Sequence, residues 1–156
     1  MQTPQEIFER ATALHLAGRV EQAIPLYAHL LKANQNNPEL LYRFGMALHQ
    51  SGRAEAAEQA LSRAVAAGPQ DASYRHALGV VLHGLGRHDE AVASYEAALA
   101  RDPLLADSLA SLGGILATGE RRAEGVAMLR RAAVLAPAGD EVWTRLGNHL
   151  QAVSDL

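Results

Sequence analysis

The chain has 156 residues, a formal net charge of −3, 4% aromatic residues and no cysteine. Because acidic side chains outnumber basic ones and no basic stripe is present, we expect no nucleic acid partner. The lack of cysteine excludes disulfides and thiolate metal sites, and no apolar run reaches the roughly 18 residues of a membrane span, so we expect no membrane insertion.

The first predicted element is a helical hairpin over residues 4–37. Thr3 can cap the first helix, Pro4 suits its first position, and Glu6 can return a bond to the cap. Pro25 falls about one turn into the second helix, where we expect only a small distortion. A second hairpin follows over 38–71, and a third over 72–105 shows the pattern most regularly, with its break at Gly86.

A fourth hairpin over 106–139 is the least regular. Glu120 stands where the earlier units have a turn glycine, and Gly125 replaces a recurring alanine. Since a left-handed Glu120 would cost about 1–2 kcal/mol, we expect the turn to form around Gly119 and this hairpin to be the loosest. Residues 140–153 then repeat the first helix of a unit, with Trp143 in register, and could cap the array or support self-association.

Small and bulky residues recur at a spacing of 34 along the chain. Small residues are expected where two helices touch, and a proline closes each unit. The persistent columns are Leu14, Leu48, Leu82, Leu116 and Leu150; Gly18, Gly52 and Gly86; Ala23, Ala57 and Ala91; Gly45, Gly79, Gly113 and Gly147; Tyr27, Leu61, Tyr95 and Leu129; and Pro69, Pro103 and Pro137.

A repeat of this length with these columns resembles the tetratricopeptide repeat family. The resemblance implies an all-α, right-handed solenoid, built as a single domain over 1–156 from four hairpins and a C-terminal capping helix at 140–153. It also implies that the first helix of each hairpin lines a concave wall while the second forms the outer layer.

The concave wall is the expected partner-binding groove. Its predicted residues recur on the first helices of the first three units, namely Phe8, Thr12, His15, Tyr42, Met46, His49, His76, Val80 and His83. The same stripe extends to Leu16, Gln50 and Gly84. If exposed together, Phe8, Tyr42 and Met46 would form an apolar patch of the kind that binds a protein or peptide. They could equally pack against the next helix as partly buried core. In the fourth unit the matching places hold Ala110, Gly114, Ala117 and Thr118.

Four histidines lie on this predicted wall. His15, His49 and His83 recur 34 residues apart, and His76 lies seven residues before His83. Seven residues rise about 10.5 Å along a helix, and neighbouring helix axes lie about 8–10 Å apart, so these imidazoles are poorly placed to share a metal ion. Descent from one ancestral unit explains the column. Alternatively, protonation near pH 6.5 would strengthen binding of an acidic peptide.

No catalytic, cofactor or metal site is predicted, because the chain lacks a nucleophile elbow, a phosphate loop and paired carboxylates in one register. We expect a cytoplasmic, non-catalytic scaffold or adaptor that binds a peptide of a partner protein. Two alternatives remain: a substrate-presenting repeat region of a larger bacterial enzyme, similar to O-linked glycosyltransferase-like proteins, and a small secretion chaperone. The basic clamp with which some family members hold acidic tails is disfavoured, since its matching places are Phe8, Thr12, Arg43, Ser73 and Ala77.

Overall fold

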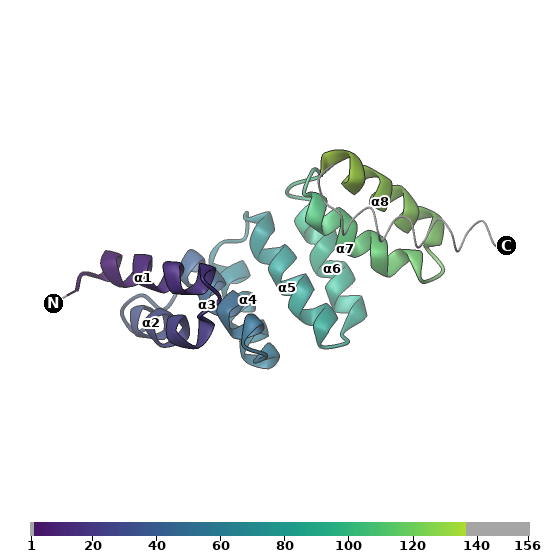
Figure 1. Cartoon of the computed structure of the whole chain (residues 1–156). Coiled ribbons are helices and arrows are strands. Elements are labelled where there is room, and N and C mark those ends of the chain that lie inside the picture. Colours follow the sequence, from purple (N-terminus) through teal and green to yellow (C-terminus); the bar gives the residue numbers. More distant parts are fainter. Residues whose placement is uncertain (1, 137–156) are drawn as a thin grey trace.

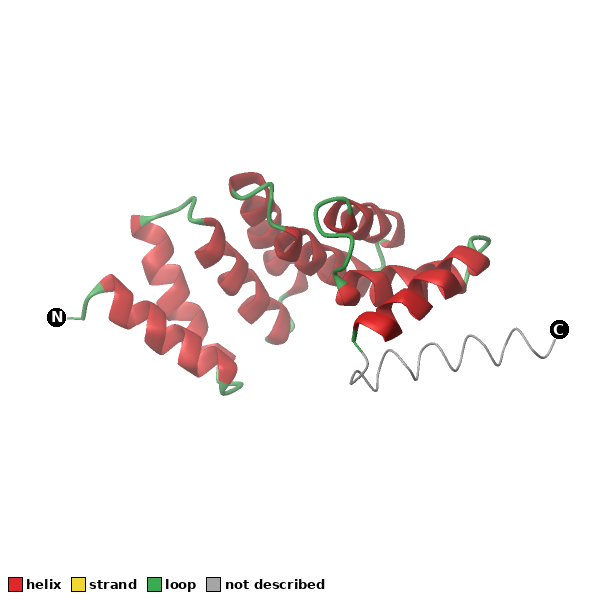
Figure 2. Cartoon of the chain, turned by 90° about the horizontal axis from the view of Figure 1, so that it is seen from above, coloured by secondary structure: helices red, strands yellow, loops and turns green. Residues whose placement is uncertain are grey.

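A computed structural model describes residues 2–136, and this part of the chain contains helices and no strand. The helices pair into consecutive hairpins that follow one another along the array (Figures 1 and 2), which confirms the all-α, superhelical fold. They are α1 (Pro4–Leu16), α2 (Val20–Ala33), α3 (Pro38–Gln50), α4 (Ala54–Ala67), α5 (Ala72–Gly84), α6 (His88–Leu99), α7 (Ala106–Ala117) and α8 (Arg122–Leu135). The helix predicted over 140–153 lies outside the described residues.

The first helices of the first three hairpins begin at side-chain caps. Thr3 and Glu6 form the predicted capping box at α1. Asn37 Oδ1 accepts the Leu40 N–H at 2.9 Å before α3, and Asp71 Oδ1 accepts the Ser73 N–H at 2.8 Å before α5. Because each cap satisfies an amide that the helix itself cannot, these residues fix where each repeat starts.

Glycine and a bulky side chain meet where the two helices of a hairpin cross. A β-carbon on Gly45 would lie 2.7 Å from Leu61 Cγ, and one on Gly79 would lie 2.7 Å from Tyr95 Cε1. Leu61 and Tyr95 are 0% and 1% exposed, so they have no space to move away. This confirms the expectation that small residues lie where two helices touch.

Helix α2 runs through Pro25 without a break, as expected. The fourth hairpin, in contrast, has a different turn, which includes Gly119 as expected. Positive φ occurs among the described residues only at Gly18, Gly52 and Gly86, so neither Gly119 nor Glu120 is left-handed. The turn from α7 to α8 instead spans residues 118–121, one residue more than the others.

The fourth hairpin is also tightly packed, so the expectation that it would be the loosest was wrong. An ideal β-carbon on Gly125 would lie 2.4 Å from the backbone nitrogen of Ala117 and 2.6 Å from the carbonyl oxygen of Gly113. Glycine at both positions lets the backbones of α7 and α8 touch, which alanine at position 125 would prevent.

Candidate peptide-binding groove

A groove of about 360 Å³ lies between α1 and α3, on the wall formed by the first helices. It is lined by His15, Leu16, Gly18, Tyr42, Arg43, Met46 and Gln50. Three of the nine predicted residues, His15, Tyr42 and Met46, therefore come together in one concavity. Leu16 and Gln50, at the end of the predicted stripe, complete it together with Arg43, which the stripe did not include.

The apolar side chains of the groove differ in how far they reach solvent. Leu16 is 81% exposed at the end of α1, whereas Tyr42 and Met46 are half-buried and pack against the core of the first two hairpins. The Tyr42 ring also lies 5.2 Å from the Tyr74 ring on α5, measured between centroids. Tyr42 and Met46 thus serve the core and the groove wall together, and Leu16 is the apolar group most available to a ligand.

Arg43 gives the groove a permanent positive charge. Its guanidinium bonds to the Glu39 carboxylate one turn earlier and lies 5.8 Å from the Phe8 ring centroid. Glu39 also accepts the Tyr74 hydroxyl at 3.3 Å. Burial, followed by the nearby Glu39 carboxylate, raises the pKa of Tyr74 to about 12, which keeps this phenol protonated as a donor.

His15 closes the groove on the side of α1. Its Nδ1 lies 3.4 Å from the Tyr27 hydroxyl, and the two rings meet edge to face with centroids 6.0 Å apart. Burial and the neighbouring Arg43 charge lower the His15 pKa, while a bond to Gln50 acts in the opposite direction. At neutral pH the groove therefore has a neutral imidazole beside a permanent cation.

The other predicted residues lie along the same helices but do not line this groove. Phe8, Thr12 and His49 are half-buried on α1 and α3. On α5, His76 and Val80 are half-buried, whereas His83 is exposed and its ring lies 5.3 Å from that of His88.

His76 packs toward the next repeat. Its Nδ1 lies 2.9 Å from Ser108 Oγ on α7, and Ser108 is fully buried. Burial lowers the His76 pKa, against a smaller opposite effect of Asp107. Because both His15 and His76 have a lowered pKa, the hypothesis that they become charged near pH 6.5 is weakened.

The fourth unit contributes less of the wall than its positions suggested. Ala110 and Ala117 are 5% and 4% exposed, so both belong to the interior.

Within residues 2–136, no cluster of three or more potential metal-ligating side chains is present. The same part of the chain has no helix with the length and apolar character to cross a membrane.

Comparison with known families agrees with this architecture. Two tetratricopeptide repeat models match the chain, one over residues 14–80 and one over residues 72–105. The chain belongs to the tetratricopeptide repeat family. Modules of this family bind protein or peptide partners and are generally non-catalytic. No curated protein matches the sequence.

Solved tetratricopeptide structures share the fold at low sequence identity. The structure of MamA is 19% identical with a TM-score of 0.80, covering 92% of this chain and 84% of that one. YrrB, described as a tetratricopeptide repeat protein with an unusual peptide-binding site, is 24% identical with a TM-score of 0.77, covering 97% and 75%. PilF of Pseudomonas aeruginosa is 15% identical with a TM-score of 0.87, covering 97% and 69%.

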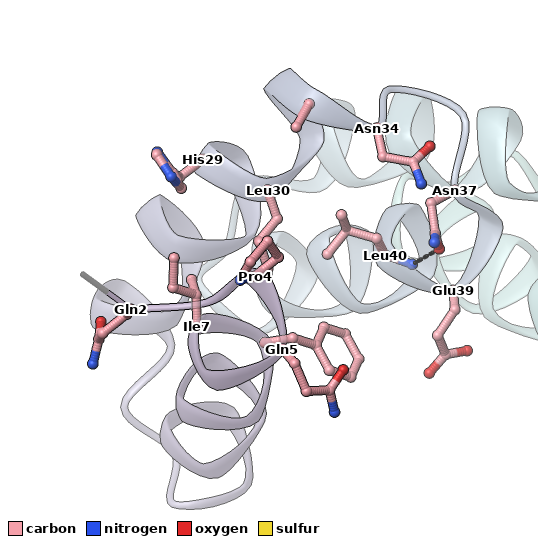
Figure 3. A pocket seen from close by; sticks show the side chains of 12 residues that line it. Gln2, Pro4, Gln5, Ile7, His29, Leu30, Asn34, Asn37, Glu39 and Leu40 are labelled. Atoms are coloured by element: carbon pink, nitrogen blue, oxygen red, sulfur yellow. Dashed lines mark hydrogen bonds between the residues drawn. The ribbon is translucent and has the colours of Figure 1, made fainter.

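A second and larger pocket of about 600 Å³ opens at the beginning of the tetratricopeptide array (Figure 3). It lies between the start of α1, the end of α2 and the start of α3. Its lining residues are Gln2, Pro4, Gln5, Ile7, Phe8, His29, Leu30, Ala33, Asn34, Asn37, Glu39 and Leu40. Of these, Phe8 alone was among the predicted site residues, and the pocket itself was missed. It shares no lining residue with the groove between α1 and α3.

Proposed function

We propose that this chain is a non-catalytic interaction module that binds a peptide segment of a partner protein in the groove between α1 and α3. The observation that carries the proposal is the meeting of Leu16, Tyr42 and Met46 with Arg43 in one concavity of about 360 Å³. Apolar side chains rimmed by a few polar groups are the usual composition of a peptide site.

Each part of the groove has a distinct task in this proposal. Leu16 and Met46 hold an apolar side chain of the partner, with the Tyr42 ring as the floor. Arg43 and Gln50 bond to polar groups that flank that side chain. The partner segment then continues along the wall, past Thr12 and His49 toward Val80 and His83, within a single domain of stacked hairpins.

The groove is shallow and open, so we expect modest affinity and a transient complex. Binding must offset the ordering of the peptide and the loss of its translational freedom, and a small contact area leaves little surplus. In this role the chain acts as a scaffold or adaptor that holds a partner without changing it chemically.

The proposal is tested by comparing how strongly the Leu16→Ala variant and the wild-type chain capture the same partner protein. Leu16 is 81% exposed, so its truncation removes groove surface without opening a core cavity. A matched control is Leu104→Ala, which truncates another exposed leucine, 65% exposed, outside the groove. We expect Leu16→Ala to weaken capture of the wild-type partner by about 5- to 30-fold, as loss of a 1–2 kcal/mol contact does, and Leu104→Ala to leave it unchanged.

A double variant, Tyr42→Ala/Met46→Ala, extends this test to the half-buried wall. Its helix content is measured alongside, because both side chains also pack in the core. Equal capture by wild type, Leu16→Ala and a folded double variant would contradict binding in the groove.

A further inference from the structure

The pocket at the beginning of the array corresponds to a place that a tyrosine ring fills one repeat later. Moving 34 residues along the chain takes Leu40 to Tyr74 and Asn34 to Gly68. Tyr74 is 7% exposed, and a β-carbon on Gly68 would lie 2.8 Å from its Cε2 atom and 3.1 Å from Pro38 Cβ. The ring and Pro38 therefore both lie beside Gly68, and the ring packs with Leu41 and Ala64. Between the first hairpin and α3, Leu40 is smaller than a tyrosine, while Leu30 stands where the later repeat has Ala64. The space that these two leucines leave is the pocket.

Glu39, which accepts the hydrogen bond of the Tyr74 hydroxyl, also has a counterpart one repeat earlier, at the pocket. Glu39 accepts that hydroxyl and is itself bonded to Arg43 one turn later. One repeat earlier these two positions are Gln5 and Glu9. Gln5 Nε2 donates to Glu9 Oε1 at 2.8 Å, and this orientation leaves Gln5 Oε1 as the acceptor. Figure 3 shows Gln5 and Glu39 on the same side of the pocket, away from His29.

The rim of the pocket is polar, and its carboxylate is paired. Among the described lining residues Glu39 is the one carboxylate, and it is bonded to Arg43; the side-chain amides of Gln2, Gln5, Asn34 and Asn37 also lie at the rim. The floor is apolar, with Ile7, Phe8, Leu30 and Leu40. An apolar floor with amide and carboxylate acceptors at the rim complements a flat, neutral side chain that carries one hydrogen-bond donor.

We propose that this pocket binds a tyrosine side chain presented by a partner peptide, with its hydroxyl donated to Gln5 Oε1 and its ring on Phe8 and Leu40. The partner supplies here the group that Tyr74 supplies within the chain. Buried Leu30 in place of Ala64 narrows the interior of the pocket, and Asn34 in place of Gly68 adds a side chain at its rim. The ring therefore enters from the solvent side and lies farther out than the Tyr74 ring does.

The two sites are adjacent, and one peptide can reach both. Phe8 lines the pocket, and the Arg43 guanidinium that lies over its ring lines the groove between α1 and α3. The tyrosine pocket nevertheless stands by itself, because it is argued from residues that the groove proposal does not use.

Binding of N-acetyltyrosinamide and N-acetylphenylalaninamide, followed by amide chemical shifts in NMR, tests the proposal. We expect both probes to shift amides at residues 4–8, 29–34 and 37–40, and the tyrosine probe to bind about 2- to 10-fold more tightly, since a net hydrogen bond is worth about that much. Gln5→Ala should abolish this preference for tyrosine. The control Gln22→Ala, at an exposed glutamine of α2 outside the pocket, should retain it.

A filled-pocket variant gives an independent readout. Leu30→Ala/Asn34→Gly/Leu40→Tyr copies Ala64, Gly68 and Tyr74 into the first hairpin and α3. We expect the ring of this variant to occupy the pocket and remove the shifts caused by both probes. Leu16→Ala should bind the probes like wild type, which separates this test from that of the groove. Shifts mapping elsewhere, equal affinity for the two probes, or undiminished binding to a folded filled-pocket variant would each overturn the proposal.

Discussion

At the scale of single residues, the hairpins depend on where a β-carbon fits. Gly79 faces the Tyr95 ring with no space for a further atom, whereas a β-carbon on Gly84, at the end of the same helix, would have no neighbouring atom within 4 Å. The same substitution at the two sites therefore has opposite consequences for packing.

Gly79→Ala should lower the free energy of unfolding by about 1–3 kcal/mol, because the added methyl overpacks a ring that is 1% exposed. Gly84→Ala should leave stability unchanged or raise it by up to about 1 kcal/mol, since alanine is the better helix former. Urea denaturation of both variants measures the difference. Similar values for the two would contradict the close contact of α5 with α6.

The free energy of unfolding should also decrease as the pH is lowered, because of the burial of His76. Burial lowers its pKa below the value of about 6.5 expected in the unfolded chain. Below pH 6.5 the unfolded chain therefore binds more protons than the folded one, and the free energy of unfolding decreases as pH falls from about 7.5 to 5. His76→Gln, which can keep a bond to Ser108, should show a smaller decrease in urea denaturation at the two pH values. An identical decrease in both proteins would contradict the burial of this imidazole.

At the scale of elements, the turns inside the hairpins are of two kinds. Gly18, Gly52 and Gly86 take φ values of 72°, 80° and 75°, which let a three-residue connection reverse the chain. The turn before α8 needs no left-handed residue because it is one residue longer.

Gly86→Ala should therefore cost about 1–2 kcal/mol, since alanine is strained at positive φ. Gly119→Ala should change stability by less than about 0.5 kcal/mol, because its φ is not positive and its β-carbon would have space. Thermal unfolding of the two variants compares them directly, and an equal loss at both would show that the last turn resembles the others.

The repeat columns made the helices and their crossings predictable. Gly79 with Tyr95, and the caps Thr3 and Asn37, follow from local rules that apply in every unit. The tight packing of the fourth hairpin was not predictable in the same way. Glycine at position 125, in place of a recurring alanine, suggested weaker packing until its position opposite Gly113 was known. The effect of a residue at a helix crossing depends on the residue that it faces on the other helix, and a column taken alone does not reveal this.

The candidate site was predictable only in part. His15, Tyr42 and Met46 were placed on the right wall by the family resemblance, but their burial depends on the next repeat, as the contact of Tyr42 with Tyr74 shows. Arg43 was named only as one place of a disfavoured clamp, and its part in the groove was missed. It directly follows Tyr42 and lies four residues after Glu39, a spacing typical of an ion pair on a helix. The pocket beside Leu40 was missed because it arises from a residue that is smaller than its counterpart, Tyr74.

At the scale of the whole molecule, the hairpins contact mainly their neighbours, with α2 against α3, α4 against α5 and α6 against α7. Such an array presents a continuous inner wall whose chemistry changes from one repeat to the next. Here the first two repeats hold both the groove and the tyrosine pocket, while Ala110 and Ala117 of the fourth repeat are buried. We therefore expect a partner to engage the first half of the array.

Site-directed photocrosslinking tests this expectation most directly, and the lack of cysteine in the chain makes it simple. Gln50→Cys and Gln59→Cys, labelled with a benzophenone maleimide, place the crosslinker at two exposed glutamines, one lining the groove on α3 and the other outside it on α4. We predict crosslinks to the captured partner from position 50 and few or none from position 59. Crosslinks from position 59 alone would contradict binding on the inner wall.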